Sequence, residues 1–237
     1  TCALPIYLLF VRDWMRDVYY NDLPDKAERD QPLRADTFAG EMEPITLSVL
    51  PLRDLGRSVL TVSDLSGPGG AIPASAVEIG YVSYRLSRVT MEGSVYTIAP
   101  RLVMPRAEVD LPKDVARRFW LTLRVPPTAA AGVYKGTVTL RPSQGATAAI
   151  PLEVRVRKGT LDEVDVPAGP WGSHIRVPWR GDDPQAAQVN RQMFLASLRR
   201  MREYGFTSCS GMPQIPYRRF KDGKCVLDFD RADEEMR

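Results

Sequence analysis

Apolar and polar residues alternate in short runs from Phe38 to Val156, and turn-forming residues separate the runs. The clearest runs are Ile45–Val49, Phe119–Val125 and Ile150–Val156, in which every second residue is apolar. Alternation with period two puts one side of a strand on a core and the other side on solvent. Many such strands predict a mainly β fold, an immunoglobulin-like antiparallel β-sandwich, over residues 7–158.

Two local signals refine this sandwich. Gly132 stands two residues before Tyr134 at the entry to a predicted strand, which is typical of a tyrosine corner. We therefore expect a buried Tyr134 ring with its hydroxyl on a loop carbonyl, in preference to a contact with a ligand. Pro151 lacks an N–H for the ladder, so it predicts an edge position or a β-bulge.

The alternation stops at residues 159–170, where acidic residues, Pro and Gly accumulate as in an interdomain linker. Beyond the linker, apolar residues recur at helical spacing and predict a helix. Asp183 is its expected N-cap, and Pro184 is its first helical residue. Gly205 is expected to end the helix as the C′ residue of a Schellman motif. The other expected elements are strands at Ser173–Trp179 and Phe206–Gly211, a loop at Tyr217–Lys224, an extended piece at Cys225–Phe229 and a helix start at Asp230.

Strand, helix, strand and helix in this order predict the first βα units of a (β/α)8 barrel over residues 171–237. Two such units cannot close a barrel, so we expect a fragment that is inactive by itself, with catalytic residues beyond Arg237. At the other end, Thr1–Ile6 match the translated end of a common sequencing adaptor, and we expect a sequencing scar there.

Charge and composition exclude several classes of protein. The 32 Lys and Arg residues and 29 Asp and Glu residues are interleaved, which argues against a nucleic-acid partner. No run approaches the roughly 18 apolar residues of a membrane helix. The three cysteines and the single His174 lack paired spacing, so we expect no metal, no cofactor and no Ser-His-Asp triad. These features do not set the oligomeric state.

Two pairs of adjacent carboxylates are candidates for catalytic groups, because glycoside hydrolysis commonly uses two. Asp162–Glu163 lies in the linker, and Asp233–Glu234 lies in the first turn of a predicted helix, where acidic residues favour the dipole. We assign neither pair a catalytic role, and predict no catalytic residue in this chain.

The barrel prediction itself marks better binding candidates, because barrel sites form at the carboxyl ends of the strands. Trp and Tyr can stack on a sugar, and Arg can bind its hydroxyls or a carboxylate. For each residue the alternative is packing at the barrel mouth. The substrate-binding candidates are Arg176, Trp179, Arg180 and Tyr217, with Met212 and Gln214 beside them.

The chain from Asp36 onward resembles glycoside hydrolase proteins related to family 123, in which a β-sandwich precedes a catalytic barrel. The motifs that carry the resemblance are AGEMEPIT at Ala39–Thr46, PLRDL at Pro51–Leu55, VSDL at Val62–Leu65, FWLTLRVP at Phe119–Pro126 and AGVYKGTV at Ala131–Val138. These motifs are structural, so they identify the architecture better than the substrate.

The resemblance implies a carbohydrate substrate. Family 123 is known for β-N-acetylgalactosaminidase activity, in which the substrate's acetamido oxygen attacks the anomeric carbon and an Asp-Glu pair assists. No position of this chain corresponds to that pair. The resemblance also implies a secreted or periplasmic protein. The alternative is a noncatalytic module that binds a carbohydrate or a protein through the sandwich.

Overall fold

In the computed structural model, the described residues are 5–90, 93–160, 166–169, 184–208, 217–221 and 224–227, the last two ranges by their backbone only. The chain divides into two compact units, a front unit Thr1–Leu161 and a rear unit Asp162–Arg237. Each unit is described by itself.

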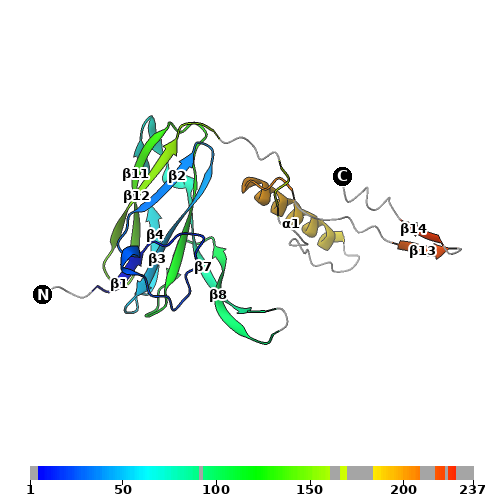
Figure 1. Cartoon of the computed structure of the whole chain (residues 1–237), viewed down its shortest axis with the longest axis horizontal. Helices are drawn as coiled ribbons and strands as arrows, with labels where there is room; N and C mark the ends of the chain where they lie inside the picture. Colours follow the sequence, from blue (N-terminus) through cyan, green and yellow to red (C-terminus); the bar gives the residue numbers. More distant parts are fainter. Residues whose placement is uncertain are drawn as a thin grey trace. The chain divides into compact units, whose positions relative to one another are not determined.

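The front unit is a β-sandwich, as the alternation predicts, and Figure 1 shows its strands in two layers. Sheet A consists, in spatial order, of β1 (Tyr7–Phe10), β3 (Met42–Pro51), β10 (Arg117–Arg124), β7 (Val77–Arg88) and β8 (Tyr96–Met104). Sheet B consists of β2 (Leu33–Phe38), β12 (Ala148–Arg157), β11 (Gly132–Pro142), β4 (Arg57–Val62) and β9 (Glu108–Asp110), with β5 (Leu65–Gly67) on β11 and β6 (Gly70–Ile72) on β5. Two short 3-10 helices, η1 (Lys26–Glu28) and η2 (Ala74–Ala76), complete the unit.

The core lies between the sheets and is filled by the apolar set of each alternating strand. Phe119, Leu121 and Leu123 of β10 are fully buried, facing the core as expected. On β3 the prediction was wrong for the other face, because Thr46 and Ser48 are also buried. A segment of chain covers that face, as described below.

The sandwich is not wholly antiparallel, because β2 pairs with β12 in parallel, Leu33 opposite Leu152. This pairing also makes β12 an internal strand, so the edge position expected for its proline is wrong for the strand as a whole. Pro151 nevertheless precedes the first β12 residue that pairs with β2, and has a neighbour only on β11, at Thr137. The missing N–H is tolerated because pairing on that side begins one residue later.

The tyrosine corner is confirmed. The Tyr134 side chain is 2% exposed, and its hydroxyl lies 2.8 Å from the carbonyl oxygen of Pro68 and 3.0 Å from that of Ala130. The ring lies against Gly67, where an added Cβ would stand 2.4 Å from the Tyr134 Cδ1 atom. The corner thus fastens the start of β11 to the β5–β6 turn.

In the rear unit, α1 spans Pro184–Glu203 and ends as predicted. Gly205 has φ of +82°, its N–H donates to the Arg202 carbonyl, and the Phe206 N–H donates to the Met201 carbonyl. These are the two hydrogen bonds of a Schellman motif. The predicted N-cap, Asp183, lies outside the described residues.

The barrel pattern does not appear in the described residues of the rear unit. Phe206–Ser208 form no strand; instead, the Thr207 and Ser208 N–H groups donate to the Ala168 carbonyl. The loop expected at Tyr217–Lys224 is wrong, because β13 (Tyr217–Lys221) pairs antiparallel with β14 (Lys224–Leu227). The Asp222–Gly223 dipeptide between them is a hairpin signal that the sequence prediction passed over.

Candidate functional site

The structure describes no side chain of the substrate-binding candidates at the predicted barrel mouth. Those outside the described residues are Arg176, Trp179, Arg180, Met212 and Gln214. Tyr217 begins β13, of which only the backbone is described. A shared substrate-binding role for these residues stays a prediction.

Within the described ranges, no group of three His, Cys, Asp or Glu residues is placed to hold a metal ion. A hollow lined by aromatic and charged side chains lies on the front unit instead. Over the same ranges, no helix has both the length and the apolarity needed to cross a membrane.

Residues 11–32, here called the crossing segment, lead from β1 in sheet A to β2 in sheet B. Arg12 closes this segment into a loop, with ion pairs to Asp22 (2.5 Å) and to Glu28 (2.7 Å). The Val11 N–H donates to the Glu28 carbonyl beside them. The Arg12 hydrogen bond holds the pKa of the Glu28 carboxyl below its usual value, and the same bond raises the pKa of Arg12.

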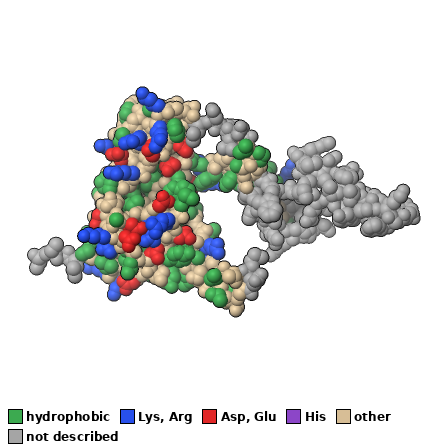
Figure 2. All heavy atoms as spheres, viewed as in Figure 1, with side chains coloured by type: hydrophobic (Ala, Val, Ile, Leu, Met, Phe, Trp, Pro, Cys, Tyr) green, Lys and Arg blue, Asp and Glu red, His purple; other side chains and the backbone are tan. Residues whose placement is uncertain are grey.

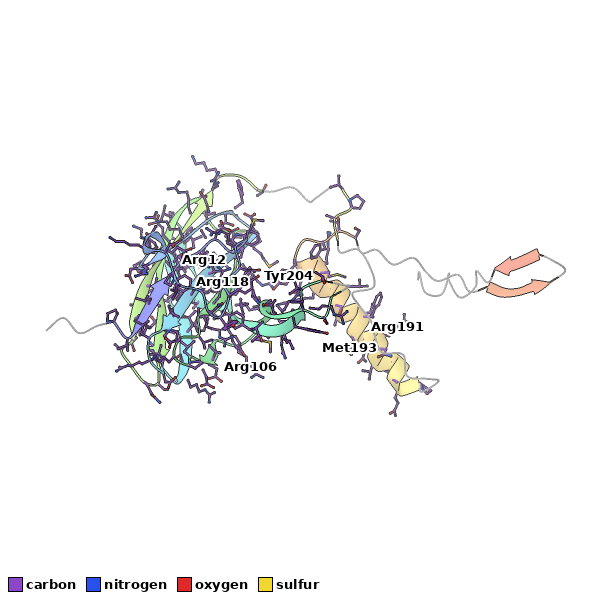
Figure 3. All side chains as sticks on the ribbon, turned by 60° about the horizontal axis from the view of Figure 1, so that its bottom comes forward. Arg12, Arg106, Arg118, Arg191, Met193 and Tyr204 are labelled. Atoms are coloured by element: carbon purple, nitrogen blue, oxygen red, sulfur yellow. The ribbon has the colours of Figure 1, made fainter. Side chains whose placement is uncertain are left out.

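Arg118 of β10 fixes the crossing segment to the outer face of sheet A. Its side chain is 3% exposed, and its terminal nitrogens lie 3.3–3.4 Å from the main-chain carbonyl oxygens of Arg12, Asp13 and Trp14. The Thr46 hydroxyl donates to the Arg12 carbonyl as well, at 3.0 Å. Figure 3 shows Arg12 and Arg118 close together on the front unit.

This buried guanidinium has no ion pair among the described residues. Burial lowers the pKa of Arg118, and the nearby Arg12 cation adds to that effect. Its Nε atom is buried without a hydrogen-bond partner in the described part of the chain. Carbonyl dipoles and the Asp17 and Asp13 carboxylates offset this positive charge.

A small apolar cluster completes the attachment, formed by Phe10, Val18, Leu50 and Ala116. Tyr84 lies next to it and donates its hydroxyl to the Ala116 carbonyl at 2.7 Å. Burial raises the pKa of the Tyr84 phenol to about 12, so it stays protonated at neutral pH. The outer face of sheet A therefore has a core of its own beneath the crossing segment.

A hollow of about 150 Å³ opens where the crossing segment meets the sheet. Trp14 and Trp120 meet there, with ring centroids 6.3 Å apart and planes at 77°. The remaining wall comes from the crossing segment, from Arg118 beside Trp120, and from β7 and β8. The full lining consists of Trp14, Asp17, Val18, Val82, Pro100, Arg101, Leu102, Val103, Arg118 and Trp120.

The β8 wall contains a β-bulge. Ser83 pairs with Leu102 and Tyr84 pairs with Pro100, so Arg101 is the extra residue between them. Its Nε donates to the Ser87 hydroxyl at 2.8 Å. A bulge of this kind redirects a side chain at the edge of a sheet.

The chemistry of the hollow favours binding over catalysis. Asp17 is the one carboxylate among the described residues that line it, so it lacks the two carboxylates of ordinary glycoside hydrolysis. Perpendicular indoles, guanidinium groups and one carboxylate instead offer stacking, donors and an acceptor to a polar ligand.

Sequence reasoning missed all these residues. Arg118 and Trp120 occupy the polar positions of an alternating strand, which predicts a solvated face. The crossing segment has no periodicity that would predict where it packs. The one usable signal was a tryptophan at a position expected to face solvent, since large aromatics are seldom left fully exposed.

Elsewhere on the front unit, the described residues form no comparable group of aromatic and charged side chains around a hollow. Figure 2 shows acidic and basic side chains interspersed on its visible face, as the interleaved charges predict. The β7–β8 ribbon also carries exposed apolar residues that are not part of the lining of this hollow, among them Leu86, Val95 and Tyr96. A second hollow, beside Tyr134, has no charged side chain in its lining.

Comparisons with known proteins identify the family of the chain. No curated protein sequence matches the chain. Among solved structures, a family 123 glycoside hydrolase from Clostridium perfringens, described for glycolipid glycan hydrolysis, matches with a TM-score of 0.69 at 12% identity. The match covers 86% of this chain and 40% of that enzyme, so the chain spans well under half of the enzyme's length.

PapD-like domain 7 of human CEP192 matches at 13% identity over 55% of this chain and 84% of that domain, with a TM-score of 0.31 that supports no inference. In sequence, the model of the glycoside hydrolase 123 N-terminal domain matches residues 16–142, from the crossing segment to the end of β11. Because these residues make up more than half of the 237-residue chain, it belongs to the family of the glycoside hydrolase 123 N-terminal domain.

Proposed function

We propose that this chain is the N-terminal part of a glycoside hydrolase that acts on glycans, with the catalytic residues beyond Arg237. The family match over residues 16–142 carries the proposal. The solved-structure match supports it, because 86% coverage exceeds what Thr1–Leu161 can supply and must extend into the rear unit. In this proposal the rear unit begins a (β/α)8 barrel.

The proposed substrates are N-acetylhexosaminides, including those of glycolipid glycans. The acetamido oxygen of the substrate would attack the anomeric carbon while an acid protonates the departing glycosidic oxygen and that C–O bond breaks. Water would then open the oxazolinium ring, and the sugar would leave with its anomeric configuration retained. Arg176, Trp179, Arg180 and Tyr217 would contact the sugar at the barrel mouth.

The test compares this 237-residue chain with the protein encoded by its gene read beyond the codon for Arg237. Both are assayed on nitrophenyl N-acetyl-β-galactosaminide and on nitrophenyl β-galactoside, which lacks the acetamido group. We expect hydrolysis of the first substrate by the longer protein only, with retention seen by NMR. Equal rates on the two substrates would contradict substrate assistance, and a complete but inactive barrel would favour the noncatalytic binding module.

A further inference from the structure

The hollow between the crossing segment and sheet A has the size of one six-membered ring. Its volume of about 150 Å³ is comparable to that of a protein cavity that holds one benzene molecule. Drug-sized ligands need roughly 300 Å³ or more. A bound group would therefore be a single ring, or the terminal ring of a longer chain that continues into solvent.

The two indoles supply the apolar part of the site. Trp14 is 45% exposed and stands at 77° to the half-buried Trp120, so the pair forms a corner of two perpendicular aromatic surfaces. Aromatic faces carry partial negative charge, which suits the C–H bonds on one face of a pyranose. A flat aromatic ligand sandwiched between two rings would need parallel rings, whereas these two stand at 77°.

The polar groups stand around this corner. Asp17 can accept hydrogen bonds from hydroxyls. Arg101 is held by Ser87 through Nε, and an arginine has four further N–H donors. A donor and an acceptor beside aromatic rings match the hydroxyls of a neutral sugar.

Arg118 acts as a positioning residue. Its contacts with the Arg12, Asp13 and Trp14 carbonyls fix the part of the crossing segment that carries the Trp14 ring. The cation is buried without an ion pair in the described residues, an arrangement that costs stability. A requirement to hold the Trp14 wall in place accounts for its position.

We propose that this hollow binds one neutral pyranose ring, stacked in the Trp14–Trp120 corner and hydrogen-bonded by Asp17 and Arg101. The site lies wholly in the front unit and uses none of the proposed barrel-mouth residues. The sandwich would then hold a glycan while another part of the protein acts on it.

The experiment is an NMR titration of the 237-residue chain, in which the indole N–H signals of the tryptophans report each site separately. The probes are methyl β-glucopyranoside, methyl β-galactopyranoside, N-acetylglucosamine and glucuronate. For at least one neutral sugar we expect saturable shifts of the Trp14 and Trp120 signals, with a dissociation constant of about 1–10 mM.

Variants test the assigned contacts. Asp17→Asn and Arg101→Met should each weaken binding about tenfold, as expected for loss of a hydrogen bond to a charged group. Arg106→Met is the matched control, because Arg106 is an exposed arginine outside the hollow and should leave affinity unchanged. Trp14→Ala removes one wall of the corner. It should abolish the sugar-induced shift of the Trp120 signal, while the rest of the spectrum remains that of the folded chain.

Several results would overturn the proposal. These are shifts confined to the signals of Trp171 and Trp179, binding of glucuronate in preference to every neutral sugar, equal affinity in Arg101→Met and Arg106→Met, or no saturable shift with any neutral sugar. The first would leave the barrel-mouth prediction standing, so failure here and failure of the proposed hydrolase are distinguishable.

Discussion

Replacing Tyr134 by Phe tests the tyrosine corner, because the change removes one oxygen and leaves the buried ring. The hydroxyl lies within hydrogen-bond distance of the Pro68 and Ala130 carbonyls. It has one hydrogen and donates to one carbonyl at a time, so the substitution removes the equivalent of one hydrogen bond. A net loss of about 1.5 kcal/mol in unfolding free energy is expected, since the hydrogen bond is partly buried and the Tyr134 side chain that makes it is only 2% exposed. With a urea dependence of about 2 kcal/mol per M, the unfolding midpoint should fall by roughly 0.7 M.

Tyr7→Phe is the matched control. The Tyr7 hydroxyl also donates to a main-chain carbonyl, that of Ala146, at 2.8 Å, but this bond is exposed to water. Water can replace the lost partner there, so the midpoint should move by less than about 0.25 M.

The measurement is hydrogen exchange of the β11 amides, read by mass spectrometry at increasing urea concentrations. This signal reports on the front unit alone, so unfolding of the rear unit does not enter the midpoint. Equal midpoints for Tyr134→Phe and Tyr7→Phe, at an unchanged urea dependence, would refute the view that the buried hydroxyl stabilises the corner.

Three further predictions concern the crossing segment and α1. The Glu28 carboxyl has a pKa lowered below 4.5 by its hydrogen bond with Arg12, so its contribution to stability is present above that pH and is lost as the pH falls through the lowered value. Glu28→Gln should be less stable than the native chain in urea at pH 7, and the difference should shrink as the pH is lowered below 4.5; a constant difference would contradict the ion pair. Arg118→Met should speed tryptic cleavage of the crossing segment about tenfold, because the Arg12, Asp13 and Trp14 carbonyls lose their hydrogen-bond donor. Arg124→Met, on the same strand, is the control, and equal cleavage rates in the two variants would count against the anchoring role of Arg118. Gly205→Ala should raise amide exchange of Phe206 about fivefold, since a φ of +82° costs a Cβ-bearing residue about 1 kcal/mol; Gly205→Asn should do so less, and equal effects would argue against strain as the cause.

The sequence predicted those elements whose stability follows from local pattern. Alternation located β3, β10 and β12, and Gly205 marked the end of α1, because period and backbone conformation are properties of neighbouring residues. The crossing segment could not be predicted in this way. Its place depends on Arg118 and Thr46, which lie far from it in sequence and look like ordinary solvent-facing residues of their strands.

The candidate site failed to appear in the sequence for the same reason. Trp14, Arg101 and Trp120 come from three separate parts of the chain, and no spacing rule connects them. The bulge that makes Arg101 an extra residue of β8 is visible only in the register with β7. The β13–β14 hairpin is a different case, because the sequence does carry a local signal for it, the Asp222–Gly223 dipeptide.

The parallel pairing of β2 with β12 has a consequence for synthesis on the ribosome. Leu33 emerges early, but its partner Leu152 is made only after the intervening strands. At about 5–20 residues per second, β2 waits roughly 6–24 s for that partner. During this time the edge of β2 that will pair with β12 is open to pairing with other chains, so the nascent sandwich is exposed to aggregation until β12 leaves the exit tunnel.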